Sequence, residues 1–168
     1  NAAVSMEVDV KSLVENVDSV TFCLSKGLSA PIGSIICGDE TFIHEARRMR
    51  KALGGGMRQA GIIAAAGIVS LNSMIKQIKE DHDHVKILVK GLSRVEGFSV
   101  DDKNIKSNIL YFKINEDQKR SNKLLDQTSD KKNYPFEVNI ENICFLETSS
   151  DRFRLVTHHG ITINDIKK

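Results

Sequence analysis

Hydrophobic and polar positions alternate between helix-like and strand-like spacing at the start of the chain, which indicates a mixed α/β protein. The apolar residues of 7–16 recur at helical intervals and predict a short helix. The β-branched, apolar runs at 17–25 and 34–38 predict two short strands, the first of them buried.

Two longer helices are predicted to follow. Residues 39–53 begin with Asp, Thr and Glu, which suits a capped helix start. Their last turn holds arginines and a lysine, which interact favourably with the negative C-terminal end of the helix dipole. Three consecutive glycines, 54–56, end that helix, and 57–95 predict another with a kink near Asn72. The first half of this second helix is small and apolar all round, which implies burial against other helices or another subunit, whereas its second half has the pattern of a surface helix.

From residue 97 onward the pattern is that of a small α/β unit. Strands are predicted at 98–102, around 106–114, and at 143–148 and 153–159, the last two being close enough to pair as a hairpin. Further predictions are a helix over 116–127, a polar loop over 128–137 and the start of a helix at 161–168. The predicted division is into residues 1–73, belonging to a larger α/β layer, and residues 74–168, a small α/β domain.

Composition narrows the class of protein. Of 168 residues, 40% are hydrophobic and 27% charged, which is typical of a globular chain. The net charge of +2 gives no basic field for nucleic acid, and no apolar run reaches the roughly 18 residues of a membrane span. The opening residues lack the pattern of a signal peptide, so none is expected. The three cysteines form an odd set without CxxC, and two lie in apolar runs where a thiol behaves as a small buried hydrophobe, so a cytoplasmic location is expected.

Lys26 follows the predicted buried strand, in the stretch CLSKGLSAP. A partly desolvated lysine at a strand end can act as a nucleophile toward carbonyl groups, which Schiff-base chemistry requires. Most lysines in such loops are simply solvated, and spacing alone favours that interpretation.

Three other groups could carry chemistry. The glycine-rich turn at 54–56 with Arg58 could hold a phosphate or carboxylate through backbone N–H groups, or could be a plain linker. Alternation on 152–159 places Arg152 and Arg154 on one strand face, where an arginine suits a carboxylate, although an ion pair with Glu147 is the more ordinary role. His and Asp at 81–84 have the wrong spacing for a metal site on a helix, so they are predicted to form a solvated face and no metal is expected.

Three segments of the sequence, taken together, indicate a protein family far more specifically than any one of them does alone. DSVTFCLSKGLSAPIGSIICG (18–38), RRMRKALGGGMRQAGIIAAAGIVSL (47–71) and RLVTH (154–158) resemble, in order and spacing, the threonine aldolases of the β-eliminating lyase group. The resemblance implies an α/β fold: the C-terminal part of the large domain of a fold-type-I pyridoxal-phosphate enzyme, followed by a small α/β C-terminal subdomain.

The resemblance also implies roles for particular residues. Lys26 matches the lysine that forms a Schiff base with pyridoxal 5'-phosphate, and Ser25 would lie near the cofactor phosphate. Lys51 and Arg58 match basic residues on the phosphate side or at a neighbouring subunit's site. Arg154 matches the arginine that binds the substrate α-carboxylate, and no chemistry is assigned to His158. The implied reaction is retro-aldol cleavage of threonine or allo-threonine to glycine and acetaldehyde, with the cofactor ring as electron sink.

In such enzymes a phosphate-binding loop, a histidine stacked on the cofactor and an aspartate that pairs with the pyridine nitrogen belong to an N-terminal half with no counterpart in 1–168. The chain is therefore expected to be a C-terminal piece of the enzyme, which as a whole acts on an amino acid as a dimer or tetramer. Two alternatives stay open: an inactive subunit that packs through its apolar 59–71 helix, and a related β-eliminating lyase.

Overall fold

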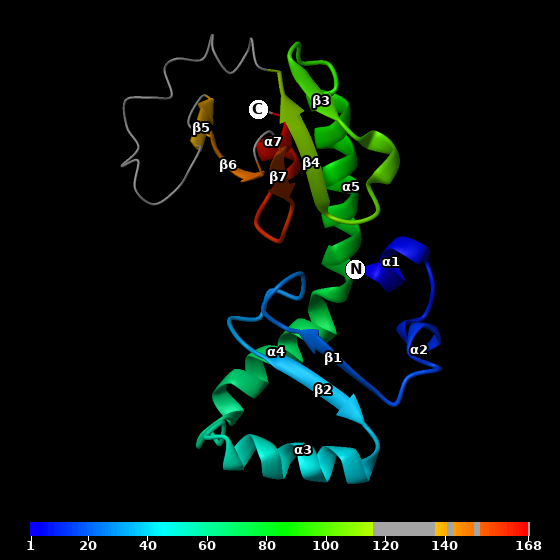
Figure 1. The fold of residues 1–168 in the computed structure, drawn as a ribbon, viewed down its shortest axis with the longest axis vertical. Helices are drawn as coiled ribbons and strands as arrows, with labels where there is room; N and C mark the ends of the chain where they lie inside the picture. The colour runs from blue at the N-terminus through cyan, green and yellow to red at the C-terminus, as the bar shows by residue number, and fades with distance from the viewer. Residues whose placement is uncertain (116–136, 141–142, 150–151, 168) are drawn as a thin grey trace. The chain divides into compact units, whose positions relative to one another are not determined.

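A computed structural model describes residues 1–115, 137–140, 143–149 and 152–167 (Figure 1). The chain forms two compact units, Asn1–Glu80 and Asp81–Lys168, which are described separately below. The predicted domain boundary between residues 73 and 74 stays a prediction, as does the assignment of each part to a domain of a larger enzyme.

The first unit opens with two short helices and a β-hairpin. Helix α1 spans Ala2–Met6 and α2 spans Val10–Leu13, so only the second lies inside the predicted helix. Strand β1 (Ser19–Cys23) pairs antiparallel with β2 (Ser34–Gly38), which confirms both predicted strands. No residue of β1 is fully buried in this chain, so the expectation of a buried strand is not met here.

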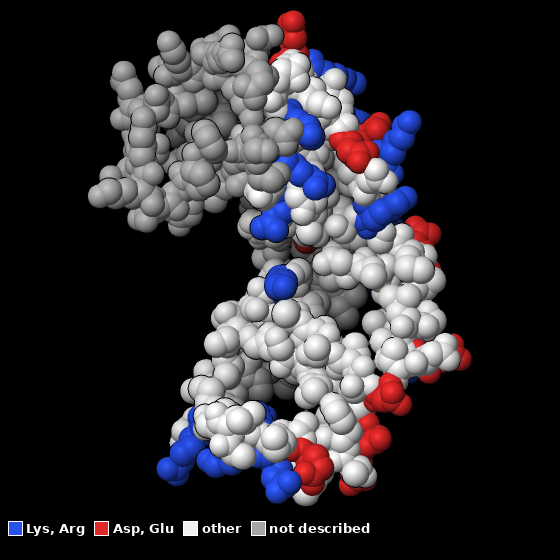
Figure 2. Space-filling model, in the orientation of Figure 1, with Lys and Arg blue, Asp and Glu red and all other residues white. Residues whose placement is uncertain are grey.

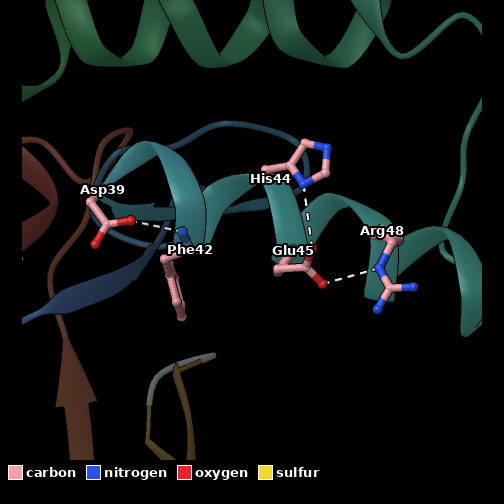
Figure 3. Close-up of polar contacts among 5 residues, drawn as sticks. All are labelled: Asp39, Phe42, His44, Glu45 and Arg48. Atoms are coloured by element: carbon pink, nitrogen blue, oxygen red, sulfur yellow. Dashed lines mark hydrogen bonds and ion pairs between the residues drawn. The ribbon is translucent and has the colours of Figure 1, made fainter.

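Helix α3 (Glu40–Ala52) confirms the predicted cap (Figure 3). The backbone N–H of Phe42 donates to Oδ1 of Asp39 at 2.7 Å, which satisfies one of the donors that a helix start leaves without a partner. Farther along, Glu45 accepts a 3.0 Å hydrogen bond from Nε of Arg48 and lies 3.5 Å from Nδ1 of His44. The two ion pairs of Glu45 are exposed and contribute little to stability.

Helix α4 (Gly61–Ser73) and helix α5 (Ile75–Leu92) replace the single kinked helix that was predicted. The break falls at Met74, two residues from the predicted kink at Asn72, and the two helices are bent by 62°. Within the described residues no single helix has the length and apolar character of a membrane span, and the α4–α5 pair meets that test only when both are counted together across their bend. Apolar side chains of α4 are exposed in this chain, Ile62 by 80% and Val69 by 63%. Their predicted burial against other helices or another subunit stays a prediction.

The second unit is an antiparallel sheet with helix α5 against one face (Figure 1). The strands are β3 (Phe98–Val100), β4 (Ile109–Ile114), β5 (Glu137–Ile140), β6 (Ile143–Ser149) and β7 (Arg152–Val156), in the order β3-β4-β7-β6-β5. A 3-10 turn (η1, Asp102–Asn104) links β3 to β4, and α7 (Ile163–Ile166) follows β7. The predicted β6–β7 hairpin is confirmed by their antiparallel pairing.

Alternation along β4 and β7 separates a core face from an exposed face. Phe112 and Phe153 stack at 5.3 Å between ring centroids and are each 1% exposed. Val85 and Val89 of α5 cluster with Leu110 of β4, so this helix supplies the other half of the core. The polar residues of the two strands lie on the opposite face.

The His and Asp residues at 81–84 are not the solvated face that was predicted. Asp81 is 1% exposed and His82 is 7% exposed, whereas Asp83 is exposed. The reason is that the end of β7 packs there: Oγ1 of Thr157 donates to the Asp81 carbonyl at 2.6 Å. Among the described residues no group of three or more His, Cys, Asp or Glu side chains is placed to hold a metal ion.

The remaining predictions concern the cysteines and residues 116–137. Cys23 is half-buried and Cys37 is exposed, so Cys37 does not behave as a buried hydrophobe. The predicted helix over 116–127 and nearly all of the predicted polar loop over 128–137 lie outside the described residues.

Candidate active site

Lys26 lies in the loop that connects β1 to β2, which is held together by backbone hydrogen bonds and is called the tied loop below. The N–H of Leu24 donates to the Gly33 carbonyl at 2.9 Å, and the Leu24 carbonyl accepts from Ala30 N–H at 3.0 Å. Between these ties, Ser29 N–H donates to the Lys26 carbonyl at 2.8 Å, closing a turn in which Ser29 takes a left-handed φ of 56°. The backbone at Lys26 is therefore held, while its side chain is exposed.

This loop contains two buried residues, one of which packs on α4. Leu24 is 5% exposed and Ala30 is 6% exposed, and both belong to the loop ties. A Cβ at Gly67 would lie only 3.0 Å from Cδ1 of Leu24, so the absence of a side chain at Gly67 allows the loop to pack closely on the helix. Ser25 and Lys26 follow this anchor directly and are exposed.

The glycine-rich turn after α3 forms a second basic segment. Gly54 has φ +84°, and the N–H groups of Gly54 and Gly55 donate to the carbonyls of Lys51 and Arg50 at 3.1 and 2.7 Å. This pattern is a Schellman C-cap, which satisfies the last carbonyls of α3. A Cβ at Gly56 would lie 2.9 Å from Nζ of Lys51, so the lysine side chain folds back over the turn.

Lysines and arginines gather where α3 ends and this turn begins (Figure 2). No ion pair among the described residues involves Lys51 or Arg58, so no carboxylate there neutralises either side chain. Both are exposed. The donor set therefore suits a phosphate or another small anion.

The loop of Lys26 and the glycine-rich turn adjoin different parts of α4. Leu24 packs beside Gly67, whereas Arg58 precedes the first residue of α4, Gly61. Six residues of helix separate Gly61 from Gly67, a rise of about 9 Å. Ser25 and Lys26 are thus adjacent in the loop that packs beside Gly67, whereas Lys51 lies in the last turn of α3 and Arg58 follows the three glycines.

Arg154 belongs to the second unit and lies on the exposed face of β7. Its cross-strand partner is Tyr111 of β4. The guanidinium carbon of Arg152 lies 3.8 Å from the centroid of the Tyr111 ring, a cation–π contact. In the part of the chain that the structure describes, no carboxylate pairs with Arg154.

Sequence reasoning missed Tyr111 and the buried cluster behind β7. Asn108 Nδ2 donates to the Thr157 carbonyl at 2.6 Å, and Thr157 Oγ1 reaches the backbone of α5. The polar positions of SNILYFKI indicated an exposed face that includes Tyr111. Its pairing with Arg154 depends on strand register, which no local pattern gave.

Comparison with known proteins decides the family. The sequence profile of the family described as "Beta-eliminating lyase" matches residues 1–115. The chain belongs to this family. It is 39% identical over 166 residues to low-specificity L-threonine aldolase 1 of Arabidopsis thaliana, covering 99% of this chain and 44% of that protein. It is 40% identical over 117 residues to the low specificity L-threonine aldolase of Escherichia coli K12, covering 70% of this chain and 34% of the relative.

Solved structures confirm the fold class. A Listeria monocytogenes protein assigned as an L-allo-threonine aldolase superposes with a TM-score of 0.71 at 17% identity, over 99% of this chain and 46% of its own. A protein from Exiguobacterium assigned as an aromatic amino acid beta-eliminating lyase/threonine aldolase gives a TM-score of 0.68 at 15% identity, covering 94% of this chain and 43% of its own. This chain thus folds as a portion of a larger threonine aldolase-like structure and spans less than half the length of these relatives.

Proposed function

We propose that this family member acts, as a complete protein, as a pyridoxal-phosphate-dependent lyase that cleaves threonine or allo-threonine to glycine and acetaldehyde. The observation that carries the proposal is Lys26: the tied loop, which contains the buried residues Leu24 and Ala30, presents an exposed primary amine. The names of the relatives, threonine aldolases of low specificity, support the substrate class.

The side chains of the first unit fit the two ends of the cofactor. Lys26 supplies the amine that an aldehyde requires, and the Ser25 hydroxyl beside it can hydrogen-bond to a phosphate. Lys51 and Arg58 supply positive charge for the phosphate dianion, either in the same subunit or across to a neighbouring one. Bound there, the cofactor would supply an electron sink for the pair released when Cα–Cβ breaks.

Arg154 is proposed to hold the substrate α-carboxylate. A guanidinium can bind a carboxylate through two parallel hydrogen bonds, which fixes the orientation of the substrate as well as its position. That orientation sets which bond at Cα is broken, so the contribution of Arg154 is positioning. Its exposed place on β7 leaves its donors accessible.

The remaining properties are proposals of the same kind. The complete protein is a homo-oligomer, a dimer or tetramer, and works in the cytoplasm on a small amino acid. The exposed apolar side chains of α4 support self-association. Neither a nucleic acid nor a membrane is proposed as a partner, because the net charge of +2 gives no basic field and no apolar run in the sequence reaches the roughly 18 residues of a membrane span.

The first experiment tests the cofactor site. The complete polypeptide, with any residues native to it beyond 1–168, is titrated with pyridoxal phosphate, and the visible absorbance band is followed. Reduction with borohydride should fix the cofactor on Lys26, as read by peptide mass spectrometry. Lys26→Ala should lose both band and label, whereas Lys11→Ala, a change at another exposed lysine, should keep them. A label spread over many lysines, or unchanged labelling in Lys26→Ala, would favour the inactive-subunit alternative.

The second experiment tests the reaction. Retro-aldol cleavage of threonine releases acetaldehyde and glycine, whereas β-elimination releases ammonia and a 2-oxo acid. Acetaldehyde release from threonine and allo-threonine supports the proposal, and release of ammonia without acetaldehyde supports a β-eliminating lyase. Arg154→Met should raise KM for threonine by about tenfold or more, because the charge-assisted hydrogen bonds from the guanidinium to the substrate carboxylate are lost.

A further inference from the structure

The exposed face of β4 and β7 carries two arginines in different surroundings. Arg152 and Arg154 are separated by one residue on β7, so both side chains leave the same face of the sheet. Arg152 is stacked on the Tyr111 ring at 3.8 Å, whereas among the described residues Arg154 has no side-chain hydrogen bond, ion pair or ring contact.

The strand register explains how Tyr111 can stack on Arg152 although Arg154 is its directly opposite residue. Tyr111 is directly opposite Arg154 across the β4–β7 ladder, and Lys113 is directly opposite Arg152. Side chains directly opposite are about 5 Å apart at Cβ, and diagonal neighbours are still within reach of an aromatic or long side chain. The Tyr111 ring is therefore within reach of both arginines, and it stacks on the diagonal one, Arg152.

We propose that Tyr111 is a positioning residue, which sequesters Arg152 by stacking and leaves Arg154 as the one guanidinium that receives the substrate carboxylate. This inference rests on the proposed function, in which Arg154 binds that carboxylate. Two neighbouring guanidinium groups can both bind a carboxylate bidentately, so an unstacked Arg152 would draw the substrate into a second, unproductive position. The ring face offers Arg152 an alternative site that needs no anion.

Substitutions at Tyr111 separate the ring face from the hydroxyl. In the complete protein, Tyr111→Leu removes the π face, and KM for threonine should rise by about two- to fivefold, the range of an exposed cation–π contact. Tyr111→Phe keeps the ring face and should stay close to wild type in both KM and kcat. Unchanged KM in Tyr111→Leu, or an equal defect in Tyr111→Phe, would overturn the inference.

A double-mutant cycle tests the sequestering role itself. Arg152→Leu removes the competing guanidinium, so adding Tyr111→Leu to it should change KM no further. Additive effects of the two substitutions would instead show that Tyr111 acts without Arg152, and the inference would be wrong. A merely structural role would lower the melting temperature and kcat of Tyr111→Leu and leave KM unchanged.

A binding measurement provides a readout independent of turnover. Glycine should bind Tyr111→Leu more weakly by the same factor as KM rises, and NMR signals of the Arg152 Nε–H group should lose their ring-current shift in Tyr111→Leu but not in Tyr111→Phe. If wild-type protein released no acetaldehyde, the proposed function would fail, and the glycine titration would still decide whether Tyr111 controls carboxylate binding. If wild type is active and Arg154→Met raises KM while Tyr111→Leu does not, the inference alone fails.

Discussion

At the scale of single residues, the glycines after α3 meet different requirements. Gly54 has φ +84° with open space around its α-carbon, so its requirement is conformational. Gly55 is confined sterically, because a Cβ there would lie 3.1 Å from the Arg50 carbonyl oxygen. The turn that carries Lys51 and Arg58 thus depends on glycine twice.

Gly54→Ala should lower the free energy of unfolding by about 1–2 kcal/mol, the cost of a left-handed conformation for a residue with a Cβ. Gly54→Asn should cost less, because asparagine tolerates that region. Gly91→Ala is the matched control: Gly91 is helical, has open space, and should gain up to about 1 kcal/mol. Urea denaturation of the three variants measures these values, and a stabilising Gly54→Ala would contradict the assigned turn.

His82 predicts how stability depends on pH. Burial, together with the nearby Lys86 cation, lowers the pKa of His82 below its ordinary value of 6.5, while Asp81 and Asp83 oppose this. Below pH 6.5 the unfolded chain therefore binds more protons at this residue than the folded chain does. Its contribution to stability is full above that pH and is lost as pH falls through the folded pKa. His82→Gln should flatten the acid side of the stability profile, and an unchanged slope would contradict this.

The candidate site was only partly predictable from residues. Lys26 was predicted as a site residue because CLSKGLSAP belongs to a specific set of motifs, and that role stays a prediction. The backbone hydrogen bonds that hold its loop, and the exposure of its side chain, became visible only in the structure. The burial of Asp81 and His82 was mispredicted because local spacing does not reveal distant contacts such as that of Thr157, 76 residues away, with the Asp81 carbonyl. Tyr111 was missed for the same reason.

At the scale of elements, the end of β7 is fastened to α5 by a buried set of hydrogen bonds. Thr157 is 1% exposed, donates Oγ1–H to the Asp81 carbonyl, and receives the Asn108 amide on its own carbonyl. Arg154 is three residues away, so this cluster fixes the strand that carries it.

Thr157→Val should lower the free energy of unfolding by about 1–2 kcal/mol, because a buried hydrogen bond is replaced by a methyl group. Thr21→Val is the matched control, since Oγ1 of Thr21 also donates to a carbonyl, at 2.9 Å to Ile35, but is exposed. That change should stay within about 0.5 kcal/mol. Chemical denaturation compares the two, and equal costs would show that burial does not decide the effect.

Elements with local signals were predicted well, and elements that depend on distant contacts were not. The cap of α3 by Asp39 and the β1 and β2 strands follow from nearby residues. The start of the next helix was placed at 57, four residues before Gly61, because the turn after the glycines carries no breaker of its own. The order β3-β4-β7-β6-β5 could not be derived, since it joins β4 to a strand nearly 40 residues away.

At the scale of the whole molecule, α4 is an apolar helix with little of its surface covered by this chain. Its apolar residues are spread evenly around the axis, and Ile62, Ile68 and Val69 are 80%, 60% and 63% exposed. An all-round apolar helix is a feature of buried segments. The chain also spans only 44% of its Arabidopsis relatives, so further polypeptide or a second subunit is the natural cover.

The proposed homo-oligomer makes a prediction that separates cover by another subunit from cover by the same polypeptide. Ile62→Glu with Ile68→Glu should dissociate the complete protein into smaller species, because burying two carboxylates in an apolar contact is costly. Within this chain both residues are exposed, so far-ultraviolet circular dichroism should keep its helical signal. Val10→Glu, a change at another exposed apolar residue of the first unit, should leave the sedimentation coefficient unchanged. If the double variant unfolds while wild type sediments as a monomer, then α4 is covered by its own polypeptide and self-association does not involve this helix.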